Sequence, residues 1–479
     1  MAVSIVLVLT SCTGVVGGHG SAAARSSASS TGPSPTESSP TTATSSPPPP
    51  ACPASYLEPD PQRPRVALTF VVSSDLTTAR GTEHIQFTPD KPITELVFRL
   101  TANTAPTVAA GNKVVITSAT ADHGAGRATY TRSGADPATQ GGLLHIPFGT
   151  PVAAGTTVTA DVAFTVTVGT NSFDRFGRTG DGTSRFAWFA SAQPLLAWER
   201  GYGWHSEDLI QFTAESATSE AMNTTLTVTA PAADTVIMSG DPADPPRTNA
   251  ATRTWRSTIS AARDVSIAVG PFAVSDTVVR GVRLRVGAYT AAVRDALVPE
   301  FVRAVTLLSA RFGPFPFPSL SVARLPSQGG GIEYPSSILM LDGSRLVAVH
   351  ETAHQWFYAM VGDSQALHPW LDEAFAQYSE ELVNGDAQLP GALQAPGVVD
   401  RSTESYGADM SGYYFVTYDK GSAALLAARQ AAGALGWDAA LRCYVDRNAW
   451  RIANPSDFAA AIKAFPAAVK ILEKAGALP

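Results

Sequence analysis

Two histidines and a glutamate in the segment His350-Glu351-Thr352-Ala353-His354 have the types and spacing needed to hold and use a metal ion. On a helix, residues four apart lie on one face, one turn from each other, so both imidazoles can reach the same ion. Glu351 would then face a water molecule on that ion without binding the metal itself. The alternative interpretation is a solvated helix that carries two unrelated histidines.

A further carboxylate, that of Glu373, follows His354 by 19 residues. It lies in the run Pro369-Trp370-Leu371-Asp372-Glu373-Ala374-Phe375, which is predicted to open a second helix. Two neutral imidazoles and one carboxylate leave an ion with net positive charge and an open position. Zinc, iron or cobalt can occupy a donor set of this kind.

Two other segments carry side chains suited to substrate contacts. The run Gly329-Gly330-Gly331-Ile332-Glu333-Tyr334-Pro335 places Glu333 17 residues before His350. Its glycines, Gly330 and Gly331, would let a substrate strand approach the backbone closely. The second run, Tyr418-Asp419-Lys420-Gly421, opens another predicted helix. For Glu333 the alternative is a solvated side chain on a surface turn.

The order H-E-x-x-H, eighteen residues, then E resembles the gluzincin metallopeptidases. The flanking runs 354–357 (His-Gln-Trp-Phe) and 370–375 narrow the resemblance to the aminopeptidase N family. The resemblance implies one zinc ion, held by His350, His354 and Glu373 with water in the fourth place. It implies that Glu351 acts as general base, passing the proton of the water to the leaving amine.

The resemblance also implies roles for Glu333 and Tyr418. The glycine segment is similar to the exopeptidase signature of the family, with Ile332 in place of the usual Met. Glu333 would hold the free α-ammonium group of the substrate by a charge-assisted hydrogen bond. Tyr418 matches the Tyr-x-Lys-Gly segment and would donate its hydroxyl to the oxyanion. The rival tyrosines nearby are Tyr406, Tyr413 and Tyr414.

A weaker match lies earlier in the chain, where Gln193 occupies the position of a glutamine that often touches the substrate N-terminus in the family. His205 and His368 are interpreted as structural or surface residues. Asp372 is interpreted as a charge at a helix N-terminus, with a hydrogen-bonding role behind the metal site as the alternative. Glu380 and Glu381 are interpreted as part of a solvated face.

The elements that must position these residues change in type along the chain. From about 62 to 275, alternating apolar runs separated by Gly, Pro, Asn and Asp predict an antiparallel β domain of sandwich or saddle type. Helical periodicity follows, with short strands at 320–325 and 338–341. The predicted helices are 291–312, 345–361, 370–384, 420–434, 437–447 and 456–465.

The predicted fold class is therefore multidomain α and β. An N-terminal antiparallel β sandwich or saddle domain precedes an α-rich catalytic domain, which the resemblance implies is thermolysin-like. The predicted divisions are a signal at 1–12, a Ser/Thr/Pro-rich tether at 13–55, the β domain at 56–277 and the metallopeptidase domain at 278–479. The resemblance covers about 62–479 and is strongest over 329–421.

The N-terminal residues predict export. The apolar run 2–9 is too short to span a bilayer, and it leads into Leu9-Thr10-Ser11-Cys12, which resembles a bacterial lipobox. No Lys or Arg precedes the run, which departs from that pattern. With Cys12 lipidated, Cys52 and Cys443 remain as a pair that forms either a disulfide or two unrelated thiols. The expected location is the outer face of the cell membrane, as a lipoprotein, or the secreted fraction.

The charge pattern limits the classes of partner that the sequence predicts. The 479 residues have a net charge of −7 and no basic stripe, which argues against a nucleic-acid partner. Three hypotheses follow: a zinc aminopeptidase acting on peptides, a zinc endopeptidase or broader hydrolase, and a surface-binding protein without catalysis. Only 106 residues follow Glu373, so an open cleft is expected, and Glu333 is the residue that distinguishes the first hypothesis from the second.

Overall fold

The computed structural model describes residues 52–53, 55–170, 175–209, 218–242, 244–327, 329–385 and 391–479, which belong to one compact unit. The predicted signal at 1–12, with Cys12, and nearly all of the predicted tether lie outside the described residues. Among the helices of the described residues, none has the length and apolar character needed to cross a membrane.

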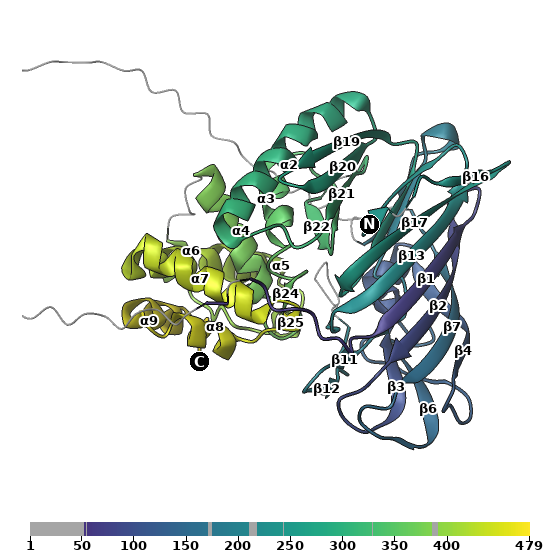
Figure 1. Ribbon diagram of the computed structural model, residues 1–479, viewed down its shortest axis with the longest axis horizontal. Coiled ribbons are helices and arrows are strands. Elements are labelled where there is room, and N and C mark those ends of the chain that lie inside the picture. Colours follow the sequence, from purple (N-terminus) through teal and green to yellow (C-terminus); the bar gives the residue numbers. More distant parts are fainter. Residues whose placement is uncertain are drawn as a thin grey trace, which may run out of the picture. The chain divides into compact units, whose positions relative to one another are not determined.

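The first half of the chain is built of strands, as the alternating pattern predicts. Buried and exposed residues alternate along β2, since successive side chains of a strand point to opposite faces. Figure 1 shows the long strands side by side in one layer. Their sheet has the order β15 (Asp241–Pro242), β17 (Thr252–Ala262), β13 (Met222–Pro231), β1 (Arg65–Val72), β2 (Thr78–Phe87), β7 (Val158–Thr167) and β4 (Lys113–Ala121), with β16 (Arg247–Asn249) paired to β17.

One pairing in this sheet departs from the antiparallel prediction, because β1 and β13 run parallel with Arg65 opposite Asn223. Two further four-stranded sheets have the orders β10-β3-β6-β5 and β14-β18-β9-β8, and β11 pairs with β12. The bounds are β3 (Ile93–Arg99), β5 (Thr129–Thr131), β6 (Leu143–Val152), β8 (Phe176–Thr179), β9 (Phe186–Ala190), β10 (Leu195–Leu196), β11 (Trp198–Glu199), β12 (Gly203–Trp204), β14 (Thr235–Met238) and β18 (Ser266–Gly270). Short helical turns lie at η1 (Thr101–Asn103), α1 (Ala105–Ala109) and η2 (Gly182–Ser184).

The second half of the chain begins with a mixed five-stranded sheet. Its order is β19 (Ala273–Val279), β20 (Val282–Ala288), β21 (Ser319–Arg324), β23 (Ser337–Met340) and β22 (Gly331–Tyr334). The glycine segment therefore leads into β22, an edge strand that runs antiparallel to β23 and carries Glu333. The predicted domain boundary at 277/278 falls within β19 and stays a prediction.

Helices make up most of the remaining chain, and several bounds agree with the prediction. Figure 1 shows α2 beside the five-stranded sheet, where it packs on β19 and β20. The helices are α2 (Ala291–Phe312), α3 (Arg345–Ala353), α4 (Trp370–Asn384), α5 (Met410–Tyr413), α6 (Gly421–Ala432), α7 (Ala434–Asn448), α8 (Pro455–Ile462) and α9 (Pro466–Ala475). Single turns η3 (Ala392–Gln394) and η4 (Thr403–Tyr406), a π-helix η5 (Tyr414–Lys420) and the short pair β24 (Val361–Gly362) and β25 (Arg451–Ile452) complete this part. No prediction was made for α9.

The prediction of a helix over 345–361 is wrong beyond Ala353. His354 is the C-cap of α3, and the backbone beyond it closes a tight loop in which the Tyr358 amide donates to the Val361 carbonyl (2.8 Å). Tyr358 has a φ of 115°, a backbone angle that residues other than glycine rarely adopt. Apolar periodicity continues through the loop because its side chains are buried, so periodicity alone did not show the helix end.

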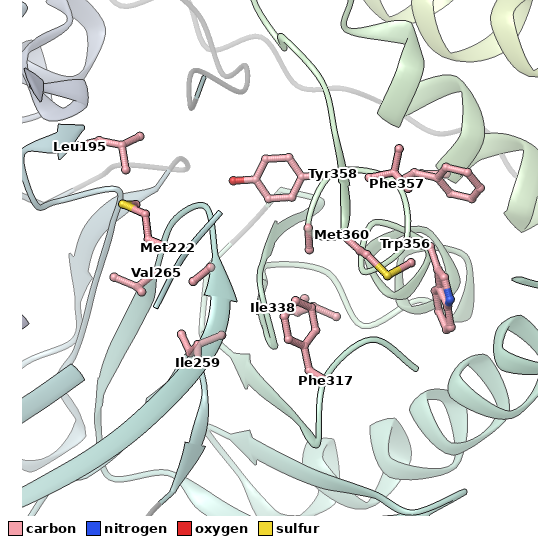
Figure 2. Close-up of a cluster of buried hydrophobic side chains, with 14 of the residues drawn as sticks. Leu195, Met222, Ile259, Val265, Phe317, Ile338, Trp356, Phe357, Tyr358 and Met360 are labelled. Atoms are coloured by element: carbon pink, nitrogen blue, oxygen red, sulfur yellow. The ribbon is translucent and has the colours of Figure 1, made fainter. Parts of the chain in front are cut away.

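One buried hydrophobic cluster draws on both halves of the chain. Figure 2 shows Leu195, Met222, Ile259 and Val265 of the strand-rich half with Phe317, Ile338, Trp356, Phe357, Tyr358 and Met360 of the helical half. The loop that follows α3 supplies four of these side chains. The position of α3 is thus set by packing against both halves.

The N-terminal end of the described chain is attached to the helical half. Cys52 and Cys443 form a disulfide, with their Cα atoms 5.0 Å apart and Cys443 on α7. Nearby, the Trp356 indole donates to the Tyr56 hydroxyl (3.1 Å), and the Leu57 amide donates to the Asp446 carbonyl (3.1 Å). These contacts connect the chain start to residues close to the metal-ligand segment.

Candidate metal centre

Helix α3 presents His350 and His354 on one buried face. The helix begins after Ser344, whose hydroxyl accepts a hydrogen bond from the Val347 amide (3.3 Å) and so satisfies one free donor of the first turn. The two imidazole rings lie 4.8 Å apart between centroids. Both are buried, with His350 8% exposed and His354 1% exposed.

Glu373, in the first turn of α4, completes a set of three donor atoms that fits a zinc ion. Its Oε2 atom lies 3.1 Å from His350 Nε2 and 3.4 Å from His354 Nε2. Tetrahedral ligands with zinc bonds of about 2.0–2.1 Å would lie about 3.3 Å apart. All three donor atoms lie within 4.8 Å of one another and all three residues are buried. The geometry therefore brings together the three ligands that the sequence predicts.

Both imidazoles are oriented by a second hydrogen bond. His350 Nδ1 lies 2.7 Å from Glu380 Oε1, and His354 Nδ1 lies 3.1 Å from the Phe357 carbonyl oxygen. Since these acceptors take a proton on Nδ1, the lone pair of each Nε2 faces the site. The interpretation of Glu380 as part of a solvated face is wrong, because it is 8% exposed and holds a metal ligand. Its spacing of seven from Glu373, two helical turns, is the signal that could have identified it.

This close packing shifts the pKa values of the histidine and glutamate side chains in the site. Burial lowers the pKa of His350, but hydrogen bonds to Glu373 and Glu380 outweigh it and hold that pKa well above its usual value. Burial raises the pKa of Glu373, but the charges and hydrogen bonds of the two imidazoles bring it below its usual range. Protons on the imidazoles would compete with a metal ion for the same lone pairs.

Glu351 lies beside Glu333 and His354 and has the surroundings of a general base. It is 4% exposed, and its Oε2 atom has no hydrogen-bond partner among the described residues. Burial raises its pKa above the usual range, although the charges of His350 and His354 oppose this. A buried carboxylate with an unpaired oxygen can accept a proton from a molecule that enters the site.

Gly331 makes room for Glu351. A methyl group added to Gly331 would lie 2.4 Å from Cγ and 2.5 Å from Oε1 of Glu351, whereas one added to Gly330 would meet no atom within 4 Å. The sequence predicted that both glycines admit a substrate strand. The structure shows a different requirement at Gly331: the β22 backbone there must leave space for the Glu351 carboxylate.

Glu333 lies beside the same group. It is 2% exposed, and its carboxylate is within 4.8 Å of ligand atoms of both Glu351 and His354. The Gln365 side chain donates from Nε2 to Glu333 Oε1 (3.2 Å) and to Asp372 Oδ2 (3.0 Å). Glu333 is therefore a buried carboxylate at the site and not a solvated residue on a surface turn.

Tyr418 contacts His350, one of the candidate metal ligands. It lies in the π-helix η5, a form that is frequent at functional sites, and its ring stacks on His350 with centroids 5.8 Å apart. Of its rivals, Tyr413 is fully buried against Tyr406 and Tyr418, and Tyr414 is 41% exposed. The arrangement favours Tyr418 for the oxyanion contact.

Gln193 is buried with one end of its amide fixed. Its Nε2 donates to Asp264 Oδ1 (2.7 Å), and its Oε1 atom has no hydrogen-bond partner among the described residues. Asp264 also accepts from the Ser191 hydroxyl and from the Val265 amide. Because Asp264 Oδ1 accepts from Nε2, the Gln193 amide is oriented with its oxygen available to a donor.

The remaining polar candidates have structural partners. His205 pairs with Glu199 (2.6 Å) and with Glu207 (3.4 Å) in the strand-rich half. His368 pairs with Asp400 (2.6 Å). Asp372 has both of the roles considered from the sequence, because its Oδ1 accepts from the Glu373 amide (2.7 Å) at the start of α4 while its Oδ2 accepts from Gln365.

Comparison with solved structures identifies the fold. An M1 zinc metallopeptidase from Deinococcus radiodurans superposes with a TM-score of 0.64 over 87% of this chain and 92% of its own, at 19% identity. A mutant of that metallopeptidase bound to a Tyr-Ser-Ala substrate gives a TM-score of 0.62 at 18% identity, over 86% of this chain and 94% of its own. A two-domain M1 zinc metallopeptidase mutant bound to L-arginine gives 0.63 at 19% identity, over 87% of this chain and 93% of its own. The chain therefore has the M1 zinc-metallopeptidase fold.

Sequence comparison points in the same direction over a shorter range. No protein-family model matches the chain. Aminopeptidase M1 of Arabidopsis thaliana is 24% identical over 186 residues, and Aminopeptidase M1-C of Oryza sativa subsp. japonica is 23% identical over 184 residues. These regions cover 32% and 31% of this chain, and the match spans about a fifth (21%) of the length of each relative.

Removing the Glu380 carboxylate is expected to weaken metal binding. Glu380→Ala frees the His350 ring, and loss of such an orienting contact costs about 10- to 100-fold in metal affinity. Chelator competition measures the change. Glu381→Ala is the matched control, because the neighbouring Glu381 accepts a hydrogen bond from the Ser422 hydroxyl (2.9 Å). Equal zinc affinities for both variants would contradict the role of Glu380.

A methyl group at Gly331 is expected to displace the Glu351 carboxylate while leaving the metal ligands in place. For Gly331→Ala we expect kcat to fall about 100-fold, the scale reported for an ångström of misplacement, with zinc content retained. Gly330→Ala separates this clash from stiffening of the segment, because its methyl group meets open space. Losses of equal size in both variants would show that displacement of Glu351 is not the cause.

Proposed function

We propose that the chain is a zinc-dependent metallopeptidase that removes N-terminal residues from peptides. In this proposal residues 56–277 form a β domain and residues 278–479 form a thermolysin-like catalytic domain. The fold, the three donor atoms and the buried Glu351 support a zinc peptidase. The relatives named Aminopeptidase M1 support the aminopeptidase activity over the matched region.

The main observation in support of the aminopeptidase hypothesis is the position of Glu333. Its buried carboxylate lies at the edge strand β22, beside Glu351 and His354. The ionised carboxylate of Glu333 is repelled by the carboxylates around it, and a cationic partner would stabilise it. The α-ammonium group of a peptide supplies that cation only when the first peptide bond lies near Glu351. A substrate bound in this way is cleaved after its first residue.

The roles of the chain's residues follow from their geometry. His350, His354 and Glu373 would hold the zinc ion, which supplies Lewis acidity that activates water and polarises the scissile carbonyl. Glu351 takes a proton from the attacking water on its Oε2 atom and returns it to the leaving amine. The Tyr418 hydroxyl donates a hydrogen bond to the developing oxyanion. In this proposal Gln193 also offers its Oε1 acceptor to the substrate ammonium.

Replacing Glu333 is expected to remove the preference for a free N-terminus. For Glu333→Ala we expect KM for aminoacyl amides to rise about 10- to 100-fold, since a hydrogen bond to a charged group is lost. N-blocked peptides, measured as substrates or as competitive inhibitors, should be unaffected. The measurement is a profile of fluorogenic aminoacyl amides against blocked peptides, with and without a chelator.

Two outcomes would contradict this proposal. Equal effects of Glu333→Ala on free and blocked peptides would favour a zinc endopeptidase or a broader hydrolase. A purified protein that holds no stoichiometric zinc, and that cleaves no amide or ester in the absence of chelator, would favour a binding protein without catalysis.

We also propose that the protein is exported and held at the outer face of the membrane by a lipid on Cys12. The lipobox-like run before Cys12 supports this location, as does the disulfide between Cys52 and Cys443, since disulfides persist in oxidising compartments. Cys12→Ser should move the protein from the membrane fraction to the soluble fraction, whereas Cys52→Ser should not. Recovery of the unaltered protein in the soluble fraction would contradict the proposal.

A further inference from the structure

We propose that Gln365 is a positioning residue that fixes the Glu333 carboxylate and connects recognition of the substrate N-terminus to the metal centre. The inference rests on the proposed function, in which Glu333 binds the α-ammonium group. Gln365 lies in the loop between β24 and α4, and its side chain is fully buried at 0% exposure.

The Gln365 side-chain amide is shared between two carboxylates. Its Nε2 atom lies 3.2 Å from Glu333 Oε1 and 3.0 Å from Asp372 Oδ2. An amide nitrogen has two hydrogens, so each carboxylate receives one. Both carboxylates are nearly fully buried, at 2% and 0% exposure, and a buried carboxylate without a donor is costly.

Asp372 carries the connection on to the metal ligand. Its Oδ1 atom accepts a hydrogen bond from the Glu373 backbone amide (2.7 Å) in the first turn of α4. The contacts therefore run without a break from Glu333 through Gln365 and Asp372 to the backbone of Glu373. A shift of the Gln365 side chain would therefore move both the Glu333 carboxylate and the start of α4.

The backbone of Gln365 is itself held. Its carbonyl oxygen accepts from the Thr403 hydroxyl (2.8 Å), and the Thr403 amide donates to the Ala366 carbonyl (2.9 Å). On the other side, Gln355 holds the backbone of the segment after Glu333: its Nε2 donates to the Tyr334 carbonyl (3.0 Å), and the Ser336 amide donates to its Oε1 (2.9 Å). Gln355 thus fixes the strand, and Gln365 fixes the carboxylate that the strand carries.

A neutral donor suits this position. Lysine or arginine in place of Gln365 would neutralise Glu333 and reduce its attraction for an ammonium group. Glutamate would add a further negative charge among Glu333, Glu351 and Asp372. An amide donates one hydrogen bond to Oε1 and leaves the charge and the second oxygen of Glu333 for the substrate.

The test is a comparison of Gln365→Met, which keeps the volume, and Gln365→Ala with the unaltered holoenzyme. We expect KM for aminoacyl amides to rise about tenfold, with kcat changing less than about threefold, since the Glu333 carboxylate loses a hydrogen bond. Binding of N-blocked peptides and zinc content should change little, whereas the melting temperature should fall, because two buried carboxylates lose a donor. Gln140→Ala serves as a control, since the Gln140 side chain makes its hydrogen bonds to the Ile116 backbone and the Tyr130 hydroxyl in the strand-rich half.

A double-mutant cycle separates this inference from the proposed function. If Gln365 acts through Glu333, Gln365→Met should add no further rise in KM to Glu333→Ala. A selective effect of Glu333→Ala together with unchanged kinetics for both Gln365 variants would overturn the inference and leave the proposed function standing. No selective effect in any variant would overturn the proposed function. Equal losses on free and blocked peptides together with lost zinc would assign Gln365 to the support of α4 instead.

Discussion

The electrostatic constraint on which the site depends is the burial of Glu333, Glu351 and Glu373 around His354. Their ionised forms repel one another across a few ångströms with little water between them. Cations must offset this repulsion. In the proposed enzyme the zinc ion does so at Glu373, and the substrate ammonium group does so at Glu333. Glu351 is left to gain and lose a proton.

The fold meets this constraint by bringing four separate segments to one place. The edge strand β22 carries Glu333, α3 carries the histidines and Glu351, α4 carries Glu373, and the π-helix η5 carries Tyr418. Close approach requires Gly331, because any larger residue would meet the Glu351 carboxylate. Loops held by buried glutamines set the distances between these segments.

The loop after α3 shows how packing positions the metal ligands. Its side chains fill a hydrophobic cluster that includes residues from both halves of the chain (Figure 2). The same loop supplies the Phe357 carbonyl that orients His354. The positive φ of Tyr358 costs about 1–3 kcal/mol, so surrounding contacts must maintain it. The loop therefore both fills the hydrophobic cluster and orients His354, a candidate zinc ligand.

The sequence alone indicated the histidine pair and the bounds of α2 and α4, because helical spacing and chain-breaking residues are local properties of the chain. The candidate ligand Glu373 and the role of Glu351 as base came from the resemblance of the longer pattern to the gluzincins. It did not show that Glu380 is buried, that α3 ends at Ala353, or that Gly331 lies against Glu351. Each of these depends on residues brought close by packing, which periodicity along one segment does not record. The pairing of Cys52 with Cys443 was left open for the same reason, since 391 residues separate them. Only the tertiary structure decided that Gln365 lies between Glu333 and Asp372, because that contact joins a strand, a loop and a helix.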